Sequence, residues 1–132
     1  MNYLLDTNIC VHYIRGNAYL SSIIKRIGAK HLYISEMTLG ELYYGAECSA
    51  RPIENHMIID RFCSLVNVIP LSNVWREFAK QKAWLRSKGT MIEDADILIG
   101  CSAITNNMIM VTENTKHFDR LRDIQIENWN IR

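Results

Sequence analysis

Short apolar runs alternate along the chain with longer segments whose apolar residues recur at helical spacing. The clearest helix spans residues 20–27, where apolar side chains fall at positions i, i+3, i+4 and i+7, and Gly28 ends it. The apolar runs of strand length cover residues 2–5, 31–34, 66–71 and 108–111, with an edge strand at 125–126. This alternation predicts βαβ units, and hence an α/β fold in which a parallel sheet of four to five strands is covered by helices on both faces.

Local signals indicate where the helices near the first two strands begin. Thr7 is a candidate cap for a short helix over residues 8–15, and Ser35 is a candidate cap for a helix over residues 36–50. Pro52 suits the first turn of the helix that follows. We expect the inner face of that helix to be formed by Met57, Ile58, Phe62 and Leu65.

Two further helices are expected in the second half of the chain. One is opened by Ser72 or Asn73, reaches residue 87 and is closed by Gly89. The other begins at Glu93 or Asp94 and runs to residue 105. The chain has no repeat, low-complexity tract or linker between these elements, so they are expected to belong to one domain over residues 1–132.

The composition is that of an ordinary globular protein. Of 132 residues, 48% are hydrophobic and 22% are charged. The formal net charge is +1, so no overall field indicates nucleic acid, and any basic surface must be local. No apolar run has the length of a membrane span or of a signal-peptide core, which predicts a cytoplasmic protein without a membrane partner.

The four cysteines are scattered and include no C-x-x-C pair: Cys10, Cys48, Cys63 and Cys101. Each lies among apolar residues of an expected helix, so we expect buried free thiols in a reducing compartment. A zinc site is disfavoured because no pair of His or Cys residues has the spacing of zinc ligands.

Carboxylates stand at the ends of expected strands and near the starts of expected helices. Asp6 follows the first strand directly, and residues 112–114 (Thr-Glu-Asn) follow the fourth. Glu41 lies two turns into the helix after the second strand, while Asp94 and Asp96 begin the last long helix. Because right-handed crossovers bring the ends of the first and fourth strands to one rim, we expect several of these acids to face each other.

Two interpretations of this acidic rim remain open. Like charges at short range raise each other's pKa or recruit a cation, and ligands that are all oxygen select Mg²⁺ or Mn²⁺. Such a cation activates water and stabilises the charge of a phosphodiester transition state. In the alternative, the acids are helix caps and solvated side chains, with Asp6 as the cap of the first helix.

Four motifs, in order over nearly the whole chain, resemble those of the PIN domain. They are Leu5-Asp6-Thr7-Asn8, Ser35-x-x-Thr38-x-x-Glu41-Leu42-x-x-Gly45, Ile92-x-x-x-Asp96-x-x-Ile99-Gly100-x-x-Ala103 and Val111-Thr112-x-Asn114-x-x-x-Phe118. Each motif alone is weak evidence for the family, but four motifs in order at the family's spacing are strong evidence. The strongest likeness is to the VapC-type ribonuclease toxins of bacterial toxin–antitoxin pairs.

The resemblance implies a three-layer α/β/α fold that binds Mg²⁺ or Mn²⁺ through a carboxylate cluster and cuts RNA. Asp6, Glu41 and Asp96 match the three core acidic positions of the family. Thr7 or Asn8 matches the polar position beside the first acid. In the implied mechanism, Asp6 and Asp96 ligate one cation, Glu41 reaches it directly or through water, and a polarised water attacks the phosphodiester in line.

One position departs from the family pattern. The fourth acidic position of many members falls on Asn114, whose amide can hold a metal, a water or the scissile phosphate but adds no charge. The resemblance therefore does not imply a second metal ion. Asp94 and Glu113 are the acids that could compensate, and Thr112 is expected to support the site.

The helix in the second half of the chain carries the local basic surface. Between residues 76 and 88 there are five basic residues and one acid. We predict that Lys82, Arg86 and Lys88 contact RNA phosphates. The alternative is a solvated helix face whose cations lie favourably near the C-terminal end of the helix dipole.

The resemblance also implies partners, and it leaves alternatives. The family's toxins are usually homodimers that cut structured RNA such as tRNA or an rRNA loop, and a small antitoxin covers their acidic site.

A non-catalytic PIN domain that binds RNA or a protein is one alternative, favoured by Asn114. A metal-dependent phosphatase is another, although the chain has no D-x-D after the first strand. His117 is near the site by the last motif, but a surface role is expected for it.

Overall fold

A five-stranded sheet in the order β3-β2-β1-β4-β5 forms the centre of the molecule, and every neighbouring pair of strands is parallel. This is a computed structural model that describes residues 1–129, and residues 130–132 of the expected domain lie outside the described residues. The strands are β1 Tyr3–Leu5, β2 Leu32–Ser35, β3 Asn67–Ile69, β4 Ile109–Val111 and β5 Ile126–Glu127. The chain proceeds from β1 toward one edge and then returns to the other side of β1, so a topological switch point lies between β1 and β4.

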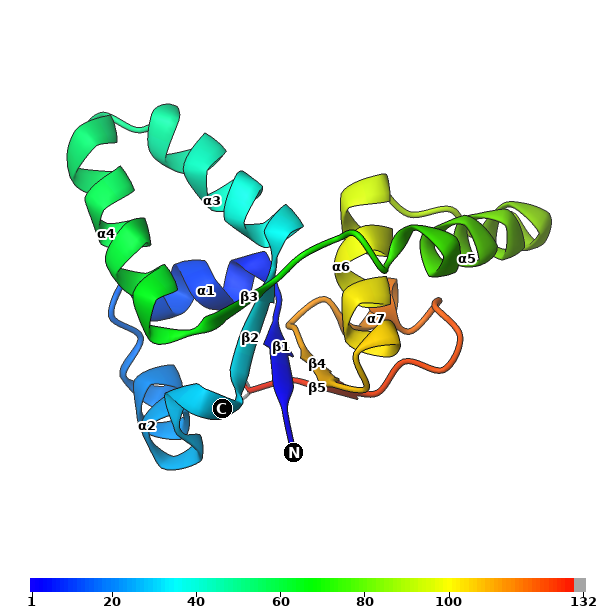
Figure 1. The fold of residues 1–132 in the computed structure, drawn as a ribbon, viewed down its shortest axis with the longest axis horizontal. Helices are drawn as coiled ribbons and strands as arrows, with labels where there is room; N and C mark the ends of the chain where they lie inside the picture. Colours follow the sequence, from blue (N-terminus) through cyan, green and yellow to red (C-terminus); the bar gives the residue numbers. More distant parts are fainter. Residues whose placement is uncertain (130–132) are drawn as a thin grey trace.

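Helices form a layer on each face of this sheet (Figure 1). Helices α1 to α4 cover one face, and α5 to α7 cover the other. Their bounds are α1 Thr7–Ile14, α2 Ala18–Ile27, α3 Glu36–Glu47, α4 Pro52–Leu65, α5 Trp75–Lys88, α6 Asp94–Thr105 and α7 Thr115–Phe118, with a 3₁₀ turn at Ala29–His31. The expected three-layer α/β/α fold with a parallel sheet of four to five strands is confirmed.

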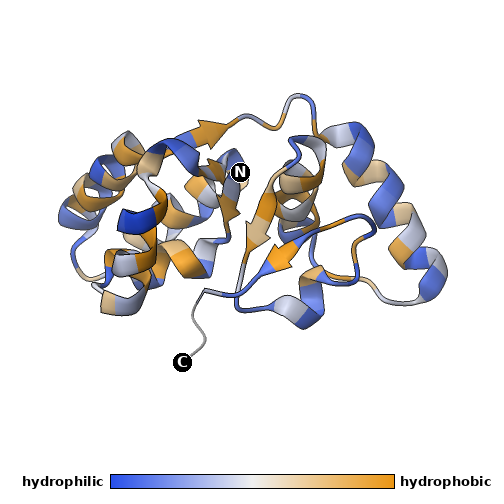
Figure 2. Ribbon diagram, turned by 90° about the horizontal axis from the view of Figure 1, so that it is seen from below, coloured by the Kyte–Doolittle hydropathy of each residue, from blue (hydrophilic) through white to orange (hydrophobic). Residues whose placement is uncertain are grey.

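Successive strand residues supply opposite faces of the sheet. Leu5 and Val111 pack in the cluster under α1 to α4, whereas Leu4 and Met110 pack in the cluster under α5 to α7. All four side chains are fully buried. Figure 2 shows the strands in orange between helices that carry blue on their outer sides. Burial on both faces explains why the central strands β1 and β4 have no polar alternation.

Several helix ends follow the local signals. Ser35 Oγ accepts a hydrogen bond from Met37 N at 3.0 Å and caps α3. Pro52 is the first residue of α4. Gly89 ends α5 in the left-handed conformation, with φ of 68°, which a residue with a side chain rarely adopts.

Two expected caps are wrong. Asp6 rather than Thr7 occupies the N-cap of α1, because its side chain accepts a hydrogen bond from the Thr7 backbone N–H. Helix α5 begins at Trp75, and neither Ser72 nor Asn73 caps it, because the chain forms a turn there before the helix starts. The expected strand ends shift by small amounts, and α7 was not predicted.

The expected inner face of α4 is also wrong in part. Phe62 is buried as expected, but its buried companion is Ile59, one turn earlier. Met57, Ile58 and Leu65 are exposed by 58%, 38% and 56%. The reason is that α4 packs beside α3 in an outer position, so only a narrow side of the helix reaches the core.

The thiols are free, as expected, but they are not all buried. Cys10 and Cys101 are buried, Cys63 is half-buried and Cys48 is exposed near the end of α3. Burial raises the pKa of the Cys101 thiol to about 12. Among residues 1–129, no helix combines the length and apolar character needed to cross a bilayer.

Candidate active site

The carboxyl ends of β1 and β4 lie side by side, and each leads into a polar residue. Leu5 pairs with Val111, and the next residue, Asp6, donates its backbone N–H to Val111 O at 2.9 Å. Asp6 therefore lies next to Thr112, which follows β4. This is the switch point of the sheet, where the crevice of an open α/β fold is expected.

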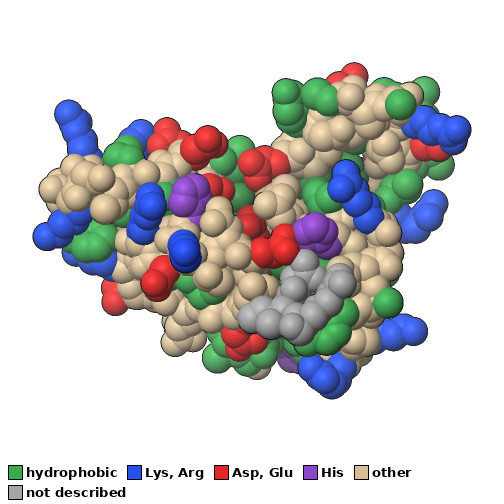
Figure 3. Space-filling view, turned by 180° about the vertical axis from the view of Figure 1, so that it is seen from behind, with side chains coloured by type: hydrophobic (Ala, Val, Ile, Leu, Met, Phe, Trp, Pro, Cys, Tyr) green, Lys and Arg blue, Asp and Glu red, His purple; other side chains and the backbone are tan. Residues whose placement is uncertain are grey.

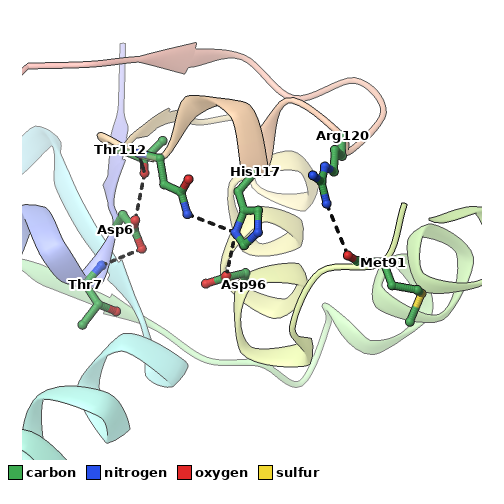
Figure 4. A network of polar contacts seen from close by, with 8 residues as sticks. Asp6, Thr7, Met91, Asp96, Thr112, His117 and Arg120 are labelled. Atoms are coloured by element: carbon green, nitrogen blue, oxygen red, sulfur yellow. Dashed lines mark hydrogen bonds and ion pairs between the residues drawn. The ribbon is translucent and has the colours of Figure 1, made fainter. Parts of the chain in front are cut away.

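The Asp6 carboxylate is held at both oxygens. Its Oδ1 accepts from Thr7 N, and its Oδ2 accepts from Thr112 Oγ1, both at 2.8 Å (Figure 4). The Asp6 side chain is nearly buried, and Thr112 is fully buried. Asp6 is thus a helix cap and a member of the site at once, so the two interpretations of this acid do not exclude each other.

Burial is the main cause that raises the pKa of Asp6 to about 6. The hydrogen bonds from Thr112 and from the Thr7 backbone oppose this rise, and the negative charges of Asp96 and Glu41 add to it. Asp6 therefore lies close enough to both Asp96 and Glu41 for their charges to disfavour its ionised form.

Thr7 joins α1 to the third acid on α3. Its Oγ1 donates to Glu41 Oε1 at 2.6 Å and lies 3.1 Å from Thr38 Oγ1. Thr38 is fully buried and Glu41 is half-buried. The half-buried carboxylate therefore has the hydrogen-bonding partner that its position requires.

Asp96 lies in the first turn of α6 and meets a side chain from α7. Its Oδ2 is 3.4 Å from His117 Nδ1 (Figure 4). The same ring nitrogen is 3.0 Å from Asn114 Nδ2. Burial is the largest cause that raises the pKa of Asp96; His117 opposes the rise, and Glu93 adds to it. Asp96 is thereby connected to the loop after β4.

Asn114 belongs to that loop and is anchored through its backbone. Its N–H donates to Thr112 Oγ1 at 2.9 Å, which ties it to the hydroxyl that also holds Asp6. Its side chain is exposed and reaches Asp96 only through His117. The amide is therefore linked to the acids through the His117 ring.

The two acids that could compensate for Asn114 already have cationic or imidazole partners. Asp94 forms an ion pair with Lys82, with Nζ–Oδ1 at 2.9 Å. Glu113 Oε1 lies 2.6 Å from His12 Nε2 on α1. Both acids thus lie at the rim of the site and are not drawn into the centre with Asp6, Glu41 and Asp96.

Asn8 and two histidines lie around the acids. Asn8 is exposed on the first turn of α1, next to Thr7 but outside the hydrogen bonds that hold the three acids. The sequence pattern gave no site role to His12 and predicted His117 on the surface. One feature of the sequence could have indicated a site role for His117. It follows Asn114 by three residues, the spacing at which side chains are neighbours on a helix.

The residues present suit a divalent cation chemically, but their side chains do not converge on one point. Among residues 1–129, no group of three His, Cys, Asp or Glu side chains is arranged to hold a metal ion. Each acid is instead held by its own neighbour: Asp6 by Thr112, Glu41 by Thr7 and Asp96 by His117. The donors are carboxylate oxygens, which is the ligand type that a hard divalent cation prefers.

The basic helix lies beside this rim. Helix α5 packs on α6, and the Lys82–Asp94 ion pair joins α5 to the first turn of α6, two residues before Asp96. Lys82 and Arg86 line a hollow of about 400 Å³ along α5, and Arg86 and Lys88 are exposed. Figure 3 shows acidic side chains gathered between the two halves of the molecule, with histidines next to them and basic side chains further out.

Comparison with known proteins identifies the family to which this arrangement belongs. A family model described as "PIN domain" matches residues 3–124, a span that includes all four motifs. The chain belongs to the PIN domain family. Ribonuclease VapC2 of Rickettsia felis is 33% identical to this PIN domain over 132 residues, with 98% of each chain covered. The tRNA(fMet)-specific endonuclease VapC of Shigella flexneri is 32% identical, also with 98% of each chain covered.

Solved structures agree with this assignment. The structure of VapBC2 from Rickettsia felis, bound to a DNA fragment from its promoter, matches with a TM-score of 0.91 and 32% identity, covering 98% of this chain and 100% of that chain. DNA-bound VapBC from Salmonella typhimurium matches with a TM-score of 0.92 and 30% identity, covering 98% of each chain. The expected resemblance to VapC-type ribonucleases with a PIN domain is confirmed, as is the class of endoribonuclease.

Proposed function

We propose that the protein is a divalent-metal-dependent endoribonuclease that acts as the toxin of a toxin–antitoxin pair and inhibits translation by cutting structured RNA. One observation carries the proposal: a full-length likeness to ribonucleases coincides with three acids, Asp6, Glu41 and Asp96, at the switch point of the sheet. The name of the Shigella flexneri relative supports tRNA as the substrate class, with an rRNA loop as the other candidate. We place this activity in the cytoplasm.

Asp6 and Asp96 would hold Mg²⁺ or Mn²⁺, with Glu41 in contact directly or through water. Bound there, the cation supplies an activated water and offsets charge on the scissile phosphate. The hydroxyl of Thr112 and the backbone of Thr7 keep the Asp6 oxygens in place. Asn114 would orient the attacking water or the phosphate, so that the new P–O bond forms opposite the P–O bond that breaks.

The first experiment is cleavage of total cellular RNA by the purified protein, freed of any co-purifying partner. We expect a few discrete products with Mg²⁺ or Mn²⁺, none with EDTA, and a loss of cleavage of at least about a hundredfold for Asp96→Asn. End mapping of the products identifies the RNA. Folded, metal-loaded protein that cuts nothing would favour the non-catalytic alternative, with Asn114 as the first residue to replace by Asp.

Partners follow from the same relatives. VapBC structures from Rickettsia felis and Salmonella typhimurium support a cognate antitoxin as the partner of this chain. We also propose a homodimer, because α4 leaves large apolar side chains exposed on the single chain, among them Ile53 by 80% and Met57 by 58%. Scattering at micromolar concentration is expected to give twice the monomer mass. A strict monomer there would contradict the homodimer.

A further inference from the structure

Helix α5 carries a hollow of about 400 Å³ on a side that faces solvent. Figure 1 shows α5 at the edge of the molecule, beyond α6. The hollow is formed by two adjacent rows of side chains at a spacing of four residues, with Phe78, Lys82 and Arg86 in one row and Ala79 and Ala83 in the other. Both alanines are exposed and end at Cβ, so they leave a low apolar floor between the larger side chains.

An aromatic ring lies at one end of this hollow. Phe78 is half-buried and packs against the core under α5 to α7. Trp75 lies edge-on to it, with the ring centroids 5.5 Å apart. Because these contacts already fix the orientation of the Phe78 ring, a flat group can stack on it without the cost of ordering the side chain.

The other two members of the same row are cations. Lys82 Nζ lies 5.7 Å from the centroid of the Phe78 ring. Arg86 is exposed at the opposite end and has no salt-bridge partner within residues 1–129. The hollow therefore combines an apolar floor with a positively charged rim.

This combination favours a nucleotide as the occupant. An apolar segment of a protein would bury the two cations without a partner, which is costly. A simple anion would pair with the cations but would leave the apolar floor unused. An unpaired nucleotide offers a flat base for the ring and the alanines, and a phosphate for Lys82 and Arg86.

The hollow also adjoins the acidic site. Lys82 Nζ contacts both carboxylate oxygens of Asp94, at 2.9 and 3.1 Å. Asp94 is the first residue of α6, and Asp96 follows two residues later, so their Cα atoms are about 5 Å apart. An RNA strand cut beside Asp96 therefore brings a neighbouring nucleotide to the hollow.

We propose that the hollow on α5 is a base-stacking subsite, in which an unpaired base next to the cut stacks on Phe78 above the two alanines, with Lys82 and Arg86 at its flanking phosphates. This inference rests on the proposed action on RNA. Phe and Ala side chains have no group that hydrogen-bonds to a base edge, so stacking there does not depend on the identity of the base.

The first test fills the hollow and compares RNA with a polyanion that has no bases. Ala83→Leu adds bulk at the exposed floor, keeps every charge and introduces a good helix former. In an Asp96→Asn background that does not cut, it should weaken binding of a single-stranded RNA of mixed sequence by at least about fivefold. Binding of inorganic polyphosphate and the salt dependence of RNA binding should stay unchanged, because no phosphate contact is removed.

Ala18→Leu on α2 is the matched control. It makes the same substitution at an exposed helix position in the opposite helix layer, and it should leave both affinities unchanged. If Ala83→Leu binds RNA as well as its parent does, no base enters the hollow and the inference is wrong. Equal losses of affinity for RNA and for polyphosphate would also contradict it, because the added bulk would then act on charge contacts alone.

Photo-cross-linking locates the base while the hollow keeps its natural residues. Single-stranded RNA that carries iodouridine, irradiated with the Asp96→Asn protein, should attach to the aromatic ring on which the base stacks. Mass spectrometry should place this cross-link at Phe78, and Ala83→Leu should abolish it while Ala18→Leu does not. Cross-links confined to other elements would overturn the subsite.

The outcomes distinguish this inference from the proposed function. If the wild-type protein cuts RNA with Mg²⁺ and Ala83→Leu binds and cuts RNA equally well, the function stands and the subsite is wrong. If the wild-type protein does not cut RNA but its binding of RNA depends on the hollow, the subsite stands and the catalytic function is wrong. A protein that binds no single-stranded RNA overturns both.

Discussion

Asp6 is at once the N-cap of α1, a residue of the candidate site and a nearly buried carboxyl group. The effect of its ionisation on the stability of the folded protein can therefore be predicted. Its folded pKa of about 6 lies above the ordinary value of 3.8, so the folded state keeps its proton over this interval while the unfolded chain loses it. Stability of the metal-free protein therefore falls as pH rises from 3.8 through about 6 and stays lower above it. Asp6→Asn removes this penalty and should stabilise the metal-free protein above pH 6 by up to ~3 kcal/mol.

Urea unfolding in EDTA, near pH 4 and near pH 8, measures this difference. Asp94→Asn is the control, since it makes the same change of charge at an exposed position beside the site. Added Mg²⁺ should reverse the order, because it would bind the wild-type protein and not the Asn variant. An Asp6→Asn protein with the same pH dependence as wild type would contradict the predicted burial cost.

For single residues, the sequence indicated which acids belong to the site but not which side chains hydrogen-bond to them. Asp6 could be singled out because a carboxylate directly after an apolar strand is a strong pattern. Thr112 was expected only to support the site, yet it holds both Asp6 and the backbone of Asn114. The contact of His117 with Asp96 depends on how two helices pack, which no local pattern encodes.

At the scale of elements, Gly100 on α6 shows how closely α6 approaches the segment after α7. A Cβ added there would overlap the Leu121 side chain and lie 3.3 Å from Phe118 and 3.5 Å from Ile124. Overpacking of this kind typically costs about 1–3 kcal/mol, whereas Ala in a helix is favoured over Gly by about 1 kcal/mol. We expect Gly100→Ala to lower the free energy of unfolding by ~1 kcal/mol.

Gly45→Ala on α3 is the matched control. No atom lies within 4 Å of the position its Cβ would take, and the residue is exposed. The helix preference then acts alone, so this variant should gain ~0.5–1 kcal/mol. Denaturant unfolding of the two variants should give changes of opposite sign, and equal changes would show that Leu121 yields without cost.

The elements differ in how far their sequences specify them. Helices with strong end signals, such as α3 after Ser35 and α5 before Gly89, were located within a few residues. The buried side of α4 was not, because its exposed apolar residues outnumber its buried ones and only packing beside α3 selects the inner side. Helix α7 has 4 residues, too few for a periodic pattern.

At the scale of the molecule, the site belongs to neither helix layer alone. Glu41 comes from α3 on one face of the sheet, and Asp96 comes from α6 on the other. Asp6 lies between them at the end of the central strand, so the sheet sets the spacing of the acids. The overall fold was predictable because it follows from alternating strands and helices, whereas the rotation of each acid toward its own partner required the tertiary structure.

The basic side of α5 lies next to this junction, and its role is testable on binding alone. In an Asp96→Asn background that does not cut, Lys82→Gln, Arg86→Gln and Lys88→Gln together should weaken RNA binding and flatten its dependence on salt. For single-stranded RNA, the slope of log Kd against log salt should fall by about 0.7 for each phosphate that the protein no longer neutralises, and so by about 2 in all. The same three changes of charge at Lys25, Arg26 and Lys30 near α2, in the opposite helix layer, should leave the slope nearly unchanged. If both sets flatten the slope equally, binding depends on net charge rather than on α5, and the hollow lined by Lys82 and Arg86 is a solvated helix face.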